Sequence, residues 1–134
     1  FERWGKLDIL VANAGVLGVI SPIGHIEAKV FEKVMTINVT ATWRLIRSVD
    51  PLLARSDAGR AVILSSGAAH KCRPFWSAYS ASKAAVEALA RTWAGESQST
   101  PLRITCVGTP ESLMSICSAV MPSAVPATLK SMSP

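Results

Sequence analysis

Three short runs of strand character, separated by stretches of helical character, limit what this chain can fold into. The runs at residues 7–12 (LDILVA) and 61–64 (AVIL) are apolar, and the third run, at residues 102–107 (LRITCV), also contains Arg103 and Thr105. A short and nearly continuous apolar run is typical of a parallel strand that is covered on both faces. In the third run Arg103 and Thr105 are expected to face away from Ile104 and Cys106. The pattern predicts an α/β fold.

Two longer segments between these runs have the composition and spacing of helices. Residues 78–94 are rich in Ala, Leu and Glu, which favour helix. From Glu27 onward, apolar residues recur at spacings of three and four. They are Val30, Phe31, Val34, Ile37, Ala41, Leu45, Ile46 and Val49. Pro51 is expected to kink this helix late in its course. Residues 16–25 and 67–76 are expected to be loops.

A serine, a tyrosine and a lysine stand at chemically useful spacings around the second apolar run. Tyr79 and Lys83 are four residues apart on the predicted helix, so they lie on one face of it. A phenol has an unperturbed pKa of about 10, and a neighbouring ammonium favours the phenolate, so the pair can donate and accept a proton near neutrality. Ser66 follows the strand at 61–64, at the edge where open α/β sheets bind ligands.

These residues resemble a known family. Ser66, then Tyr79 thirteen positions later, then Lys83 in YSASK, match the Ser…Tyr-x-x-x-Lys signature of the classical short-chain dehydrogenases/reductases. Asn13-Ala14-Gly15, directly after the first apolar run, resembles the family's Asn-Ala-Gly turn. Asn38 in MTINVTA resembles the asparagine of the family's fourth helix. Four motifs in this order are far more specific than an isolated Tyr-x-x-x-Lys.

The resemblance implies a fold, an activity and a set of roles. The fold would be the C-terminal part of a Rossmann-type doubly wound parallel sheet. The activity would be the NAD(P)-dependent interconversion of an alcohol and a carbonyl in a small molecule. The implied catalytic residues are Asn38, Ser66, Tyr79 and Lys83. The residues implied to contact the cofactor, which is NAD or NADP, are Asn13, Ala14, Gly15, Tyr79 and Lys83.

Two of these motifs also have simpler interpretations. Asn13-Ala14-Gly15 is compatible with an ordinary turn at the end of a strand, since Asn and Gly are common there. Asn38 and Thr40 are compatible with an exposed polar patch on the helix. In the family the asparagine helps to hold a water that passes the proton between lysine and solvent.

One feature of the family has no counterpart in this sequence, the glycine-rich phosphate loop of its first strand and helix. We therefore expect an N-terminal portion to be missing and the chain to be inactive alone. Residues 1–111 are expected to form a partial domain of the family, and residues 112–134 a divergent tail. The alternative is a non-catalytic fragment, or a module that interacts through its helices.

Composition argues against several other functions. The net charge is +5, but the 14 Lys and Arg are scattered singly and lack interleaved aromatic residues, so nucleic-acid binding is not expected. The uncharged stretch 9–26 contains Pro22 and three glycines, which argues against a membrane span. Cys72, Cys106 and Cys117 have no C-x-x-C spacing, so neither disulfides nor a metal site is expected.

These observations predict a cytoplasmic protein. A homo-oligomer is also implied for the complete protein, because the family pairs two of its helices with those of another copy. A stripe of small residues on the second predicted helix would permit such close approach. It consists of Ala78, Ala81, Ala85, Ala88 and Thr92.

Overall fold

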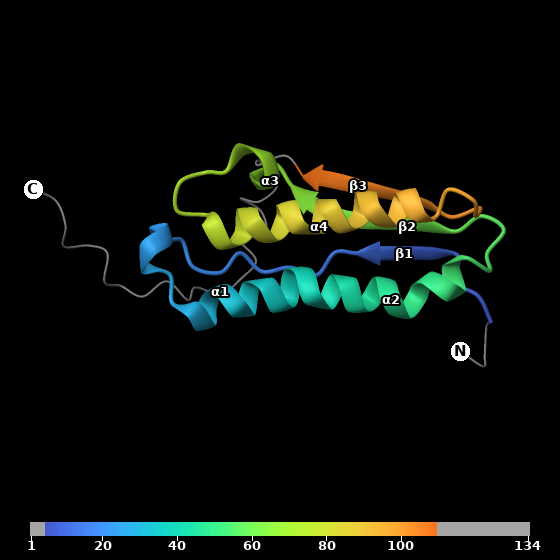
Figure 1. The fold of residues 1–134 in the computed structure, drawn as a ribbon, viewed down its shortest axis with the longest axis horizontal. Coiled ribbons are helices and arrows are strands. Elements are labelled where there is room, and N and C mark those ends of the chain that lie inside the picture. Colours follow the sequence, from blue (N-terminus) through green and yellow to red (C-terminus); the bar gives the residue numbers. More distant parts are fainter. Residues whose placement is uncertain (1–4, 110–134) are drawn as a thin grey trace, which may run out of the picture.

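In the computed structural model, which describes residues 5–109, three parallel strands form one sheet (Figure 1). They are β1 (Ile9–Ala12), β2 (Arg60–Ser66) and β3 (Arg103–Thr109), and they follow this order across the sheet. The three segments predicted as strands therefore form strands. The tail predicted at 112–134, which includes Cys117, lies outside the described residues.

One helical run joins β1 to β2. It consists of α1 (Ala28–Met35), the π-helical turn η2 (Thr36–Thr40) and α2 (Ala41–Leu53). The helix predicted from Glu27 onward is therefore confirmed, and it continues past Pro51 to Leu53. A π-helical turn inserts one extra residue per turn, so it shifts the side chains that follow it around the axis.

Helix α4 (Ser77–Glu96) joins β2 to β3, as the composition predicted. Two short helices were not predicted, η1 (Ile23–His25) and α3 (Ala68–Lys71). They lie within the segments predicted as loops. Each is four residues long or less, which is too short to produce a hydrophobic period in the sequence.

The core lies between the helices and one face of the sheet. Helix α4 packs on β2 and β3, α2 packs on β1, and α1 contacts α4, so the long helices share a layer (Figure 1). The strands contribute alternate residues to this core, because successive side chains point to opposite faces. The buried cluster consists of Leu10, Leu53, Ala61, Ile63, Val86, Ala90, Trp93 and Leu102.

The opposite face of the sheet differs from expectation, since the apolar runs predicted strands covered on both faces. Ile9 is 65% exposed, Val11 58% and Val107 40%. The strand register places these three side chains on the face that points away from the core. No described helix packs there, so this open face, defined by Ile9, Val11 and Val107, remains in contact with solvent.

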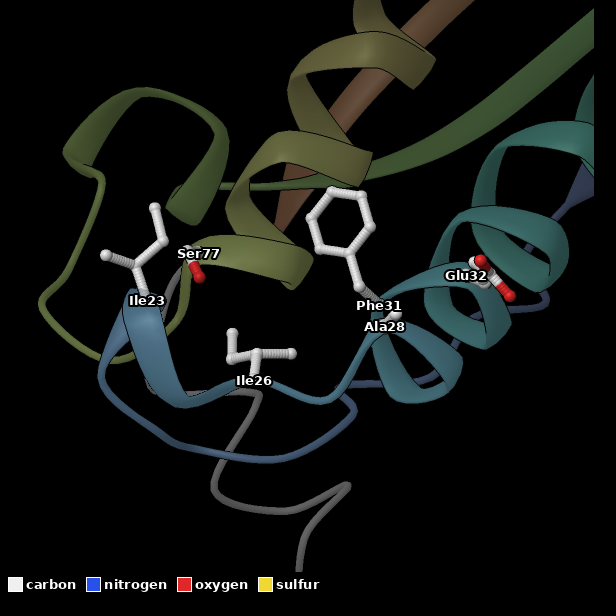
Figure 2. A pocket seen from close by; sticks show the side chains of 6 residues that line it. All are labelled: Ile23, Ile26, Ala28, Phe31, Glu32 and Ser77. Atoms are coloured by element: carbon white, nitrogen blue, oxygen red, sulfur yellow. The ribbon is translucent and has the colours of Figure 1, made fainter.

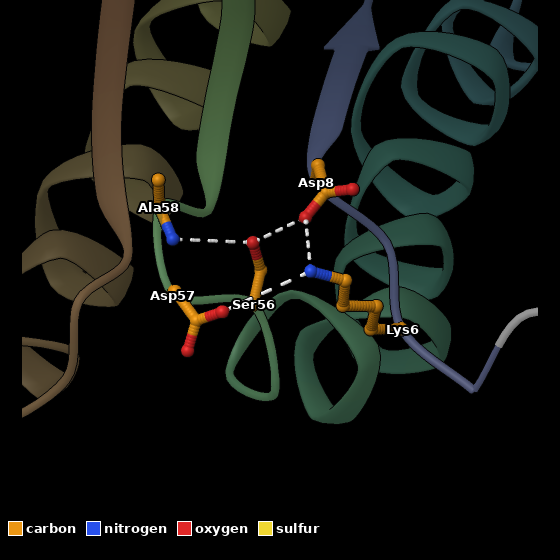
Figure 3. A network of polar contacts seen from close by, with 5 residues as sticks. All are labelled: Lys6, Asp8, Ser56, Asp57 and Ala58. Carbon is orange, nitrogen blue, oxygen red and sulfur yellow. Dashed lines mark hydrogen bonds and ion pairs between the residues drawn. The ribbon is translucent and has the colours of Figure 1, made fainter.

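A polar network fixes the end of the sheet where β1 begins (Figure 3). The Ser56 hydroxyl donates to the Asp8 carboxylate and accepts from the Ala58 backbone N–H at 3.2 Å. Lys6 Nζ lies 3.4 Å from Asp8 and 3.9 Å from Asp57. The hydrogen bond from Ser56 is the largest effect and lowers the pKa of Asp8; desolvation opposes it, and the charge of Lys6 adds a smaller lowering effect. The network ties the turn after α2 to the start of β1.

Candidate active site

Helix α4 places Tyr79 and Lys83 beside the carboxyl end of β2. Lys83 is only 5% exposed, and its ammonium donates a hydrogen bond to the Leu64 carbonyl oxygen at 2.8 Å. The same nitrogen lies 5.7 Å from the centroid of the Tyr79 ring. Burial lowers the pKa of Lys83, because removal from water penalises the ammonium form. Tyr79 is itself buried, with its ring edge-on to that of Trp76.

Asn38 is buried within the π-helical turn η2, which excludes the interpretation as an exposed polar patch. Its side-chain oxygen accepts from the Val16 N–H at 2.8 Å, and its side-chain nitrogen donates to the Val16 carbonyl at 2.9 Å. That nitrogen also donates to the Ser82 hydroxyl at 2.9 Å. Asn38 thus holds the loop after β1 against helix α4.

Ser82 was not singled out from the sequence. Its hydroxyl donates to the Tyr79 carbonyl at 2.7 Å and accepts from Asn38, so it links the helix that carries Tyr79 to η2. The only available signal was its position directly before Lys83 and three residues after Tyr79. Serine is common on helix surfaces, so this position alone did not distinguish it.

Gly15 brings the loop after β1 to the same place. A Cβ atom at Gly15 would lie 3.4 Å from Lys83 Nζ and 3.5 Å from Asn38 Oδ1. The absence of a side chain therefore leaves space next to the lysine ammonium. Asn13 and Ala14 precede Gly15 and are exposed. No described hydrogen bond joins their side chains to Asn38 or Lys83, so of these three residues Gly15 is the one that the structure brings to the cluster.

Ser66 is the last residue of β2 and is fully buried. The Ala68 N–H, at the start of α3, donates to the Ser66 hydroxyl oxygen at 3.2 Å. The lysine ammonium binds the carbonyl of Leu64, two residues earlier on the same strand. Ser66 therefore lies at the carboxyl edge of the sheet, where the sequence placed it.

The segment between Ser66 and Tyr79 has an unusual backbone. Cys72 and Phe75 have φ angles of 45° and 73°, in the left-handed region that bulky side chains rarely adopt. The Phe75 carbonyl accepts from the Ser21 N–H at 3.1 Å, and its side chain is 54% exposed. The Phe75 ring is therefore more exposed than buried, and the contact of this residue with the loop after β1 is made by its backbone carbonyl.

A cavity of about 330 Å³ opens at the start of α4 (Figure 2). It is lined by Ile23, Ile26, Ala28, Phe31, Glu32 and Ser77. None of the predicted site residues lines it, although Ser77 precedes Tyr79 by two positions. The Ser77 hydroxyl is buried and has no hydrogen-bond partner among the described residues.

Among residues 5–109, no three His, Cys, Asp or Glu side chains are grouped so as to hold a metal ion. No described helix combines the length and the apolar character needed to cross a membrane.

A polar cluster at the carboxyl edge of a parallel α/β sheet lies where open α/β folds bind their ligands. The short chain dehydrogenase family model matches residues 1–116. The chain therefore belongs to the short-chain dehydrogenase/reductase family.

Relatives in two bacteria are similar to most of this chain. The oxidoreductase YciK of Escherichia coli K12 is 36% identical over 128 residues, which are 96% of this chain and 50% of YciK. The NAD-dependent oxidoreductase Rv0687 of Mycobacterium tuberculosis is 41% identical over 96 residues, which are 71% of this chain and 34% of that protein. The chain thus spans half or less of the length of these relatives.

Solved structures agree with this membership. A short chain dehydrogenase of Shigella flexneri complexed with NADP is 38% identical, with a TM-score of 0.77 over 81% of this chain and 45% of that one. A short chain dehydrogenase of Escherichia coli CFT073 complexed with NADPH is 33% identical, with a TM-score of 0.79 over 90% of this chain and 51% of that one.

Proposed function

We propose that this chain is part of an NAD(P)-dependent oxidoreductase that interconverts an alcohol and a carbonyl in a small molecule. The observation that carries the proposal is the convergence of elements on the ammonium of Lys83. That ammonium binds β2 two residues before Ser66, faces the ring of Tyr79 and adjoins the backbone of Gly15. Three segments far apart in the sequence thus meet at one buried cation.

The roles follow from the chemistry of the side chains. In the reducing direction the Tyr79 hydroxyl donates a proton to the substrate oxygen, and in the oxidising direction the phenolate accepts it. Ser66 binds the same oxygen, and the Lys83 ammonium favours the phenolate. Asn38 positions a water through which the proton reaches solvent.

The residues present fit one half of the cofactor. When bound, a nicotinamide cofactor supplies or accepts the hydride. Lys83, beside the space left by Gly15, would hydrogen-bond a ribose hydroxyl of the cofactor, and Asn13 and Ala14 are exposed in the same loop. The pyrophosphate half has no glycine-rich loop in this sequence. We therefore propose that the chain is inactive alone, and that the choice between NAD and NADP is made outside it.

The test compares the chain alone with the same chain joined to the N-terminal half of YciK. Calorimetric titration with NADH and NADPH is expected to show saturable binding for the joined protein and none for the chain alone. In the joined protein, Tyr79→Phe is expected to lower turnover about 100- to 10,000-fold, because a general acid is lost while cofactor contacts remain.

Trp43→Phe, at an exposed aromatic residue of α2, is the matched control and should leave turnover unchanged. Turnover of the Tyr79→Phe protein within a few fold of the parent would remove the catalytic assignment. Saturable cofactor binding by the chain alone would instead remove the proposal that it is inactive.

A second candidate is a non-catalytic module that pairs through its helices. It is favoured by Ala81, Ala88 and Thr92, small side chains that lie exposed along α4 and would let another helix approach closely. In the enzyme the same surface would join copies into a homo-oligomer. Sedimentation of the joined protein distinguishes the candidates when combined with the titration, because a module pairs without binding cofactor.

We propose the cytoplasm as the compartment of this protein, which the free thiols of Cys72 and Cys106 support.

A further inference from the structure

Glu87 is a buried carboxylate that the proposed reaction does not use. It lies on α4, one helical turn after Lys83, and its side chain is only 10% exposed. One carboxylate oxygen accepts a hydrogen bond from the Ser65 hydroxyl at 2.7 Å. The other lies 2.9 Å from His70 Nε2 and 3.6 Å from Arg91 Nη1.

The partners of Glu87 stand on both sides of Ser66. Ser65 precedes it on β2, and His70 lies on α3, the short helix that follows it. The Ala68 N–H at the start of α3 binds the Ser66 hydroxyl oxygen. Glu87 therefore holds the strand before Ser66 with one oxygen and the helix after it with the other.

Lys83 adds a third connection from the same helix. Residues four apart on a helix lie one above the other, and Lys83 and Glu87 bind the consecutive residues Leu64 and Ser65. The two side chains thus set the register of β2 against α4. Tyr79 stands on the same face of α4, two turns before Glu87, so this register also sets Ser66 relative to Tyr79.

Stability alone does not explain a carboxylate at this position. The carboxylate of Glu87 is buried, whereas the side chains of His70 and Arg91 that face it are 70% and 69% exposed, and ion pairs with exposed partners contribute little to stability. The particular contribution of Glu87 is directional, since each of its oxygens must meet its donor at a hydrogen-bonding distance. We propose that Glu87 is a positioning residue, which fixes the turn that carries Ser66 against the helix that carries Tyr79 and Lys83. This inference rests on the proposed function, in which Ser66 and Tyr79 act on the same substrate oxygen.

The experiment measures amide hydrogen exchange in the 134-residue chain, without cofactor or substrate. In Glu87→Leu, which loses both connections, exchange at Ala68 is expected to rise roughly tenfold or more relative to exchange at Ile63 and Val86 in the core. Glu87→Gln keeps an acceptor for Ser65 but not the charge that faces His70, so a smaller rise is expected. Ser65→Ala should reproduce part of the effect.

Arg91→Ala is the matched control, since Arg91 contacts Glu87 but lies on α4 itself and not beside Ser66. It should leave the ratio of exchange at Ala68 to that at Ile63 unchanged. A purely structural role predicts that Glu87→Gln and Glu87→Leu raise exchange at all three amides by the same factor, and that result would overturn the inference. Should Glu87→Leu fail to fold, Glu87→Gln and Ser65→Ala decide in the same way.

The outcome is separate from that of the proposed function. If the joined protein binds cofactor while exchange at Ala68 changes by the same factor as exchange at Ile63 and Val86, the positioning role of Glu87 is wrong and the proposed function is retained. If exchange at Ala68 rises selectively while the joined protein binds no cofactor, the link made by Glu87 is retained and the proposed function is wrong.

Discussion

At the scale of single residues, Lys83 shows how the site shifts an ionisation equilibrium. Burial lowers the pKa of its ammonium, whereas in the unfolded chain the group has an ordinary value of about 10.4. Between these two values the unfolded chain binds more protons than the folded one. The free energy of unfolding therefore rises with pH across that window, and the cost of burying the charge is fully present below it.

Replacing this lysine should remove that pH dependence. In Lys83→Met the free energy of unfolding is expected to rise less than in the parent as the pH increases from about 7 to about 10. Urea denaturation followed by circular dichroism at the two pH values measures the difference. Lys29→Met, at an exposed lysine of α1, serves as the control and should keep the slope of the parent. Equal slopes of the free energy of unfolding against pH for the two variants would show that burial does not lower the pKa of Lys83.

At the scale of secondary-structure elements, the strands and long helices could be predicted because each carries a repeated pattern. The runs of β1 and β2 are apolar over several residues, and α4 is rich in helix formers over its whole length. The π-helical turn η2 could not be predicted in this way. Its sequence, TINVT, continues the apolar spacing of α1, and the contacts of its Asn38 with Val16 and Ser82 are made to distant segments.

The same distinction applies to the candidate site, where local geometry could be predicted and packing between distant segments could not. Tyr79 and Lys83 could be paired from their spacing on one helix, since that geometry is local. Glu87 could not be recognised, because on a helix surface a glutamate four residues before Arg91 indicates an ordinary exposed ion pair. Its contacts with Ser65 and His70 depend on how α4 packs against β2 and α3. Sequence spacing contains no information about that packing.

The burial of Asn38 in η2 gives a prediction at this scale. In Asn38→Asp a carboxylate oxygen replaces the amide that donates to the Val16 carbonyl and to Ser82. We expect the free energy of unfolding to fall by about 1–3 kcal/mol, because buried acceptors lose their donor. Denaturant titration measures the change at neutral pH. The same substitution at the exposed Asn13 should have no comparable effect, and an equal loss at both positions would contradict the role of η2 as the tie to α4.

At the scale of the whole molecule, the described layers are unequal. One face of the sheet lies under α1, α2 and α4, and the open face lies in water. The apolar pattern of β1 predicted burial on both faces, and the structure provides it on one. The apolar residues of a strand indicate that both of its faces are suited to burial, but they do not identify the element that covers each face. Apolar side chains exposed on a sheet are expected to promote association between copies of the chain.

A charge on the open face should therefore reduce association without unfolding the protein. Val11→Lys is expected to change the free energy of unfolding by no more than about 0.5 kcal/mol, because the side chain points into solvent. Light scattering at increasing protein concentration should show fewer large species than for the parent. Leu10→Lys places the same charge in the core from the adjacent position and should unfold the chain. An equal loss of stability in Val11→Lys and Leu10→Lys would contradict the exposure of Val11. Association of Val11→Lys as readily as the parent would show that association arises from a surface other than this face.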